Sequence, residues 1–230
     1  MKTFVIGDIH GNYKALMQCL DKSNFSHKKD QLICLGDVAD GYPDVTKCFE
    51  ELLKMNNLVY VLGNHDSWLI DWLKDEKRPH IWVSQGGANS IASYISSPLE
   101  LRAKHLEFLK AKAKLHYTDD SNRFFVHGGY NPNIPISDNL TDTFLWDRDI
   151  IDYAVANKVS GKEFDYKEVF IGHTTTEYRF ASMKPQHISN LWMLDTGAGW
   201  SGKLTIMNVE TKEYWQSDKA SDLYNINPRR

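Results

Sequence analysis

The residues best suited to chemistry follow five short apolar runs, each of which ends beside glycine together with aspartate, asparagine or histidine. The runs are FVI, LICL, VYVL, FFV and VFI, and the polar residues after them include Asp8, His10, Asp37, Asn64, His127 and His173. A single glycine and polar residue after a strand usually form an ordinary turn, but five such strand ends in one chain are difficult to explain as turns alone. The other histidines lack this context and are expected to be structural: His27, His80, His105, His116 and His187.

The chemistry that these side chains offer is metal binding. They supply carboxylate, amide and imidazole donors without a thiolate, a combination that suits divalent transition-metal ions. Six such side chains are more than a single ion needs, so the pattern favours two ions.

A sheet must bring these runs together, and the first half of the chain alternates strand and helix patterns. Strands are expected at residues 3–6, 31–35 and 58–62, and helices at 12–23, 43–55 and 66–75. This alternation is typical of a mainly parallel sheet in an α/β protein. In such a sheet the loops at the carboxyl ends of neighbouring strands meet in one crevice, so the six polar residues are expected to converge.

The second half has a different pattern. Residues 80–115 are expected to be helical, with short strands at 123–126 and 168–171 and a helix near 149–158. Around residues 187–217, apolar runs separated by short turns predict an antiparallel meander. We expect one domain over residues 1–216, followed by a polar and loosely ordered tail over residues 217–230.

The composition is that of an ordinary globular protein, with 230 residues of which 42% are apolar and 25% charged. A net charge of -3 does not indicate a nucleic-acid partner. Three cysteines without metal-type spacing are typical of a reducing compartment. No apolar stretch approaches the ~18–20 residues of a membrane span, and the chain enters a strand directly. A cytoplasmic location without a membrane partner is therefore expected.

The motifs GDIHG, GDVADG, GNHD, HGG and GHT occur in this order, and together they resemble the calcineurin-like metallophosphoesterases. The most similar branch is that of the phosphoprotein phosphatases, which includes bacterial protein phosphatases and symmetrical diadenosine tetraphosphatases. Softer matches at SQGGANSIASY, LWDRD and LDTGAGWSGKLTIMNV extend the resemblance from residue 4 to about residue 206. The resemblance implies an α/β fold in which a two-sheet β-sandwich is flanked by helices.

The resemblance also implies roles for individual residues. Two divalent ions, Mn²⁺ before Fe, Zn or Ni, would be bound by Asp8, His10, Asp37, Asn64, His127 and His173, with Asp37 bridging. A hydroxide bridging the ions would attack phosphorus. His65 would protonate the leaving oxygen, and Asp40 would orient His65. Arg148 of LWDRD, together with Asn64, would bind the substrate phosphate.

One motif departs from the family, because Asp40-Gly41-Tyr42-Pro43 stands where the family has Asp-Arg-Gly-Pro. The absent arginine would clamp a phosphate through two parallel hydrogen bonds, and the Tyr42 hydroxyl is a candidate to replace part of this contact. The expected activity is phosphomonoester hydrolysis, including that of phosphoproteins, with a dinucleoside polyphosphate hydrolase or phosphodiesterase as the alternative. An alternative of another class is a metal-binding scaffold with weak catalysis. The expected partner is a phosphorylated protein, nucleotide or small molecule.

Overall fold

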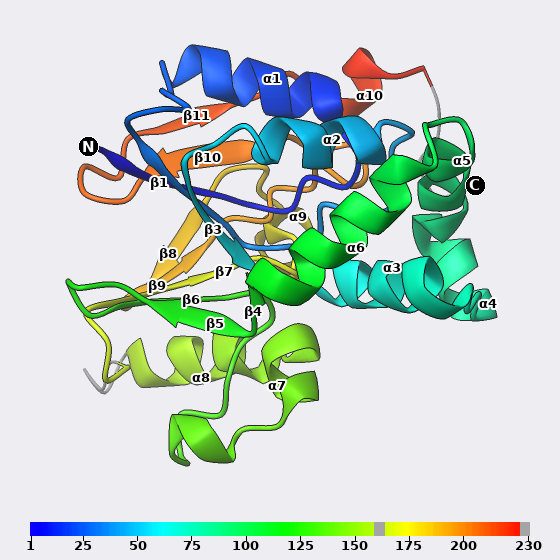
Figure 1. Ribbon diagram of the computed structural model, residues 1–230. Helices are drawn as coiled ribbons and strands as arrows, with labels where there is room; N and C mark the ends of the chain where they lie inside the picture. Colours follow the sequence, from blue (N-terminus) through cyan, green and yellow to red (C-terminus); the bar gives the residue numbers. More distant parts are fainter. Residues whose placement is uncertain (159–163, 226–230) are drawn as a thin grey trace.

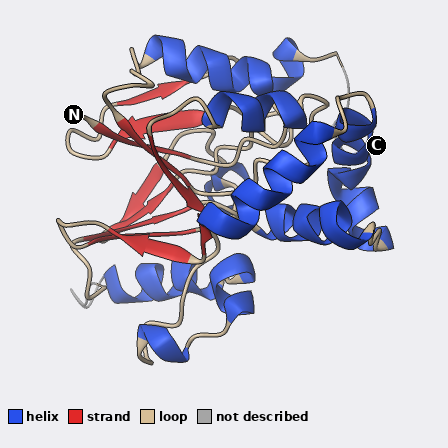
Figure 2. Ribbon diagram, viewed as in Figure 1, coloured by secondary structure: helices blue, strands red, loops and turns tan. Residues whose placement is uncertain are grey.

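Two stacked β-sheets flanked by helices make up the computed structural model, which describes residues 1–158 and 164–225 (Figure 1). The first sheet has the strand order β11-β10-β1-β2-β3-β4 and the second β5-β6-β7-β9-β8. The strands of the first sheet are β1 (Thr3–Ile6), β2 (Gln31–Cys34), β3 (Asn57–Val61), β4 (Ala113–Lys114), β10 (Thr205–Asn208) and β11 (Tyr214–Gln216). Those of the second are β5 (His116–Thr118), β6 (Arg123–Val126), β7 (Glu168–Ile171), β8 (Gln186–Ile188) and β9 (Leu191–Met193). The predicted two-sheet α/β sandwich is confirmed (Figure 2).

Helices cover the outer faces of both sheets: α1 and α2 lie over the first sheet, and α8 lies against the second (Figure 1). The larger helices are α1 (Tyr13–Lys22), α2 (Val45–Leu52), α3 (Asn64–Asp75), α5 (Ala88–Ile95), α6 (Glu100–Lys112), α7 (Thr141–Trp146) and α8 (Asp149–Lys158). Short helical segments are α4 (His80–Trp82), η1 (Val83–Gly87), η2 (Ile136–Asp138), α9 (Thr176–Phe180) and α10 (Ala220–Leu223). The predicted alternation of strand and helix up to residue 75 is confirmed. In the part of the chain that the structure describes, no helix has the length and apolar character to cross a membrane.

The carboxyl ends of the parallel strands are level with one another. Ile6, the last residue of β1, pairs with Cys34, the last residue of β2. In the second sheet, Val126 at the end of β6 pairs with Ile171 at the end of β7. Because strands that end level release their loops at the same edge, the polar residues after them emerge together.

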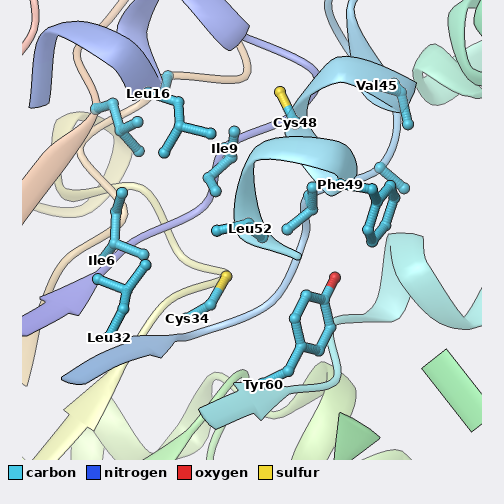
Figure 3. Close-up of a cluster of buried hydrophobic side chains, with 14 of the residues drawn as sticks. Ile6, Ile9, Leu16, Leu32, Cys34, Val45, Cys48, Phe49, Leu52 and Tyr60 are labelled. Carbon is cyan, nitrogen blue, oxygen red and sulfur yellow. The ribbon is translucent and has the colours of Figure 1, made fainter. Parts of the chain in front are cut away.

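Alternation along β1 shows why these strands are continuous apolar runs. Phe4 and Ile6 belong to the core between the first sheet and the helices, whereas Val5 belongs to the core between the two sheets. A strand covered on both faces needs apolar side chains at every position. Figure 3 shows the helix-side core, in which Ile6 lies near side chains of α2 such as Leu52. This double burial holds the strand ends, and therefore the loops after them, in place.

The prediction of one antiparallel meander over residues 187–217 is wrong. Strands β8 and β9 form a hairpin in the second sheet, and β9 also pairs in parallel with β7. Strands β10 and β11 form a second hairpin, which joins the first sheet where β10 pairs with β1. Alternating apolar residues indicate a strand but not its partner, so the pattern could not show that residues 194–204 cross from one sheet to the other.

Two further segments differ from the expected picture. The helical region over 80–115 is bent at η1, where Gln85 and Gly86 leave helical geometry and Gly86 has a φ of 107°. The segment 217–225 packs against the domain, because Ala220 is fully buried and Tyr224, which is 8% exposed, lies in one cluster with Tyr42. A polar sequence with Tyr224 as its one aromatic residue concealed this contact with Tyr42.

Candidate active site

The loops after the parallel strands bring the predicted site residues together in one buried cluster. A ligand atom from each of His10, Asp37 and His65 lies within 4.8 Å of the other two, and the same holds for Asp37, His127 and His173. Asp37 is common to both groups. The arrangement is therefore two adjacent ligand sets that share one carboxylate.

Asp8 and Asn64 lie beside the second of these groups. The two carboxylate oxygens of Asp8 accept the backbone N–H of His173 at 3.2 and 3.0 Å. The Oδ1 atom of Asn64 is 2.9 Å from Nε2 of His127. All six residues predicted as metal ligands are thus buried and brought together. His65, predicted as an acid, is a member of the first group, whereas Asp8 is a member of neither.

The loops after β1, β2 and β7 bend sharply at site residues. His10, Asp37, Asp40 and His173 all have positive φ angles, of 49°, 47°, 70° and 62°. Residues other than glycine rarely adopt this conformation, and when they do they cluster at functional sites. The bends direct these side chains away from the strand ends and into the shared cluster.

The imidazole rings are oriented as metal ligands would be. In His10 and His127, Nδ1 lies 3.0 and 2.8 Å from a backbone carbonyl oxygen, to which an N–H can donate. This contact favours the tautomer that leaves Nε2 unprotonated, and Nε2 lies 3.7 Å from Asp37 Oδ2 in His10 and 3.3 Å in His127. The Nε2 atom of His173 is buried and has no hydrogen-bond partner among the described residues. Since an unpaired buried nitrogen is costly, these residues fit divalent ions.

The buried carboxylates of the cluster also favour the binding of cations. Burial and the neighbouring carboxylate of Asp195 raise the pKa of Asp8 well above its usual range. Burial disfavours charge on Asp37 as well, but His127 and His65 outweigh it and hold the pKa of Asp37 well below its usual range. Burial lowers the pKa of His127, yet the carboxylates of Asp37 and Asp8 outweigh burial and raise it to about 10. In the metal-free protein a proton on His127 therefore supplies positive charge to buried acids.

Metal binding is expected to strengthen with rising pH, because His127 must lose that proton to offer Nε2 to an ion. Below a pKa of about 10 the free protein holds the proton and the metal-bound protein does not. Each unit of pH should therefore raise the affinity about tenfold per proton released. His173 should release none, since burial, followed by the charges of His127 and Arg148, lowers its pKa to about 2. Calorimetric titration with Mn²⁺ in buffers of different protonation enthalpy measures the release, and an affinity independent of pH would contradict the expectation.

The predicted acid and its partner are in contact. His65 Nδ1 lies 2.5 Å from Asp40 Oδ2, and Asp40 is fully buried. Each of them lies close in sequence to a predicted ligand. Asp40 follows Asp37 in the loop after β2, and His65 follows Asn64 at the start of α3. The ring of His65 packs edge-on against Trp68, with centroids 5.2 Å apart.

Sequence reasoning missed two buried carboxylates. Asp66 accepts the backbone N–H groups of Val38 and Ala39 at 3.0 Å, and that of Gly63 at 3.2 Å, so it ties together the loops after β2 and β3. Its position near the start of α3 in GNHD was the available signal, since an acid there commonly caps a helix. Asp195, from the softer match LDTG, lines the cavity over the cluster.

A cavity of about 660 Å³ opens onto the cluster and is lined by His10, Asp37, Asn64, His65 and His173 among others. Arg148 also lines it, and its Nη1 donates to Thr174 Oγ1 at 2.9 Å. Large aromatic side chains contribute to the same lining while remaining partly or largely exposed: Trp146 (39%), Tyr178 (84%) and Trp200 (46%). The site therefore has a polar floor and a partly aromatic rim.

The position of the absent family arginine is tightly packed. Gly41 has a φ of 72°, and a Cβ atom there would lie 2.9 Å from both Cβ and the carbonyl oxygen of His10. The expectation that Tyr42 replaces the arginine is wrong, because its hydroxyl donates to the carbonyl of Trp200 at 2.5 Å. The buried Tyr42 ring packs on Tyr224, with centroids 4.9 Å apart. Tyr42 therefore anchors the loop of Trp200 and has no proton left to donate to a phosphate.

Comparison with known proteins gives consistent matches. The family model described as calcineurin-like phosphoesterase matches residues 1–198. Symmetrical bis(5'-nucleosyl)-tetraphosphatase of Pseudomonas fluorescens (strain SBW25) is 24% identical, over 97% of this chain and 96% of its own length. Serine/threonine-protein phosphatase 1 of Salmonella typhimurium is 25% identical, over 90% of this chain and 91% of its own length. The crystal structure of a metallophosphoesterase from Sphaerobacter thermophilus shares the fold, with a TM-score of 0.58 at 20% identity over 95% of this chain and 89% of that chain.

Proposed function

Because the chain belongs to the calcineurin-like phosphoesterases, which are metal-dependent hydrolases, we propose that it is a dinuclear enzyme hydrolysing phosphomonoesters. The observation that carries the proposal is the position of Asp37 in two adjacent groups of ligand atoms. Two neighbouring ions can act on the attacking and the leaving oxygen of one displacement. A buried carboxylate shared by two sets of imidazoles could bridge such a pair.

We propose the ligand sets that the family resemblance implies, which keep the second group whole and replace His65 of the first group by Asp8. One ion would be held by Asp8, His10 and Asp37, and the other by Asp37, Asn64, His127 and His173. When bound, the ions supply a water of lowered pKa and positive charge for the phosphate oxygens. We propose Mn²⁺, with Fe, Zn and Ni as alternatives, because oxygen and imidazole donors without thiolate suit these ions.

His65 is the proposed proton donor to the leaving oxygen. It lines the cavity, while its Nδ1 is held by Asp40 at 2.5 Å, which leaves proton delivery to Nε2. A neighbouring carboxylate stabilises the imidazolium and fixes its orientation. General acid catalysis of this kind typically contributes ~10²–10⁴-fold in rate.

The charge of the cavity favours a substrate with one phosphate. Arg148 is the only lysine or arginine among the described residues that line the cavity, and we propose that it binds the phosphate together with Asn64. Glu177 and Asp195 also line the cavity. The outer phosphates of a polyphosphate would therefore meet carboxylates rather than additional cationic side chains, which costs electrostatic energy.

A dinucleoside polyphosphate is the second candidate substrate. The aromatic rim of Trp146, Tyr178 and Trp200 favours it, because exposed rings of this kind can stack on nucleobases. The similarity to a symmetrical bis(5'-nucleosyl)-tetraphosphatase supports the same candidate.

A substrate panel tests the proposal. The protein is loaded in turn with Mn²⁺, Fe²⁺, Zn²⁺ and Ni²⁺ and assayed with an aryl phosphomonoester, an aryl phosphodiester, a phosphoserine peptide and diadenosine tetraphosphate. We expect two ions per chain, activity only with metal, and the highest kcat/KM for a monoester. The highest kcat/KM for diadenosine tetraphosphate would replace the monoester proposal by the second candidate. Two bound ions without turnover of any ester would favour the scaffold instead.

A further inference from the structure

The carboxylate of Asp40 is held by more than His65. The indole N–H of Trp82 donates to Asp40 Oδ2 at 2.8 Å, the same oxygen that contacts His65. The hydroxyl of Ser90 donates to the other oxygen, Oδ1, at 2.6 Å, and accepts the backbone N–H of Asp40 at 2.8 Å. We infer that Trp82 and Ser90 are positioning residues for the His65–Asp40 pair, an inference that rests on the proposed function of His65 as the acid.

These two residues come from a part of the chain remote from both partners. Trp82 ends α4 and Ser90 lies in α5, on either side of the bent segment η1. Both side chains are fully buried, so their hydrogen bonds to Asp40 are not incidental contacts at the protein surface. Each bond spans more than 40 residues of sequence, since 42 separate Trp82 from Asp40 and 50 separate Ser90 from it. The bond to Asp40 is therefore a product of the fold and not of local chain geometry.

The bent segment η1 packs closely against the loop that carries Asp40. Gly86 has a φ of 107°, and a Cβ atom there would lie 2.6 Å from the backbone nitrogen of Gly41 and 3.4 Å from Asp40 Cβ. A Cβ atom on Gly87 would lie 2.6 Å from Cε2 of the Trp82 indole. Only glycine allows η1 to approach both the loop of Asp40 and the indole this closely. The bent segment η1 thus packs both on the loop of Asp40 and on the indole that contacts the carboxylate.

The hydrogen bonds from Trp82 and Ser90 hold the carboxylate of Asp40 in one orientation. An ionised carboxylate can accept about four hydrogen bonds, and here each oxygen has at least one neutral donor besides any bond to His65. Ser90 holds the main chain and the carboxylate of Asp40 at once, which stops the group from turning. Oδ2 therefore stays directed at Nδ1 of His65, and the other nitrogen of the imidazole stays directed at the leaving oxygen.

The dependence of the rate on the leaving group tests this role. We expect Trp82→Phe and Ser90→Ala each to lower kcat for an alkyl phosphomonoester about tenfold or more, the worth of one hydrogen bond to a charged group. Hydrolysis of a dinitrophenyl phosphate should change little, because its leaving oxygen needs no proton. The ratio of the two rates is taken on one preparation, so it does not depend on the fraction of protein that is folded.

Trp72→Phe provides the matched control. Trp72 is also buried in this cluster, with its ring centroid 6.3 Å from that of Trp82, but its indole nitrogen has no hydrogen-bond partner among the residues described. Its substitution should leave the ratio unchanged. Equal losses on alkyl and dinitrophenyl esters in Trp82→Phe and Ser90→Ala would overturn the inference and show a purely structural role. Absence of turnover in the wild-type protein loaded with metal would overturn the proposed function itself, which keeps the two failures distinct.

Discussion

Replacing Asp37 by asparagine is expected to lower turnover by ~10²–10³-fold or more, the cost typical of losing one preorganised electrostatic group. Asp37 is the residue shared by the two groups of ligand atoms, and its Oδ1 also accepts the backbone N–H of His65 at 2.9 Å. Asparagine keeps the size of the side chain but presents one neutral oxygen and an N–H₂ group. Both ions should therefore bind more weakly, and the thermal stabilisation by Mn²⁺ should be lost together with activity.

Metal content by mass spectrometry, the shift in Tm with Mn²⁺ and kcat on a monoester measure these effects. Asp71→Asn is the control, since Asp71 lies on the same helix as Asn64 but its side chain is 51% exposed, 3.7 Å from the ammonium of Lys77. This variant should behave as the wild type in all three measurements. An Asp37→Asn protein that kept two ions and wild-type turnover would show that Asp37 does not bridge them.

The predictable part of the site is the part that strand geometry controls. The apolar runs FVI and LICL predicted β1 and β2, and Ile6 and Cys34 are indeed paired residues at the ends of these strands. Level strand ends made the convergence of Asp8 and Asp37 a consequence of sheet geometry. Both inferences concern the first sheet alone. His127 and His173 were expected to converge from the same sheet, whereas they follow β6 and β7 of the second sheet.

The part that could not be predicted depends on contacts between remote segments. Trp82 donates to Asp40 across 42 residues, beside a helical region that bends at Gly86, and a helical sequence pattern does not show where a helix will bend. Tyr42 lies next to the motif but its hydroxyl is directed to Trp200, which follows it by 158 residues. Local patterns indicate which side chains are present, whereas partners across such distances are chosen by packing.

Replacing His65 by asparagine is expected to lower kcat for an alkyl phosphomonoester by ~10²–10⁴-fold, the usual worth of a general acid. Asparagine cannot supply a proton to the leaving oxygen, and it leaves the buried carboxylate of Asp40 without the imidazole that lies 2.5 Å away. A dinitrophenyl phosphate should be affected far less, since its leaving oxygen departs as an anion. Rates on both esters with saturating Mn²⁺ measure the difference.

The same variant decides between two roles that the geometry of His65 allows. A ring nitrogen of His65 falls within 4.8 Å of ligand atoms of His10 and Asp37, and the rings of His10 and His65 are 4.9 Å apart. If His65 is the acid, His65→Asn keeps two ions and loses rate selectively on the alkyl ester. If His65 is a ligand, the protein loses one ion, and both esters slow together. The Nδ1 partner of His65 is the carboxylate of Asp40, which is itself held by Trp82 and Ser90, whereas the Nδ1 partners of His10 and His127 are backbone carbonyl oxygens. Because a carboxylate partner stabilises a protonated imidazole, we expect the first result.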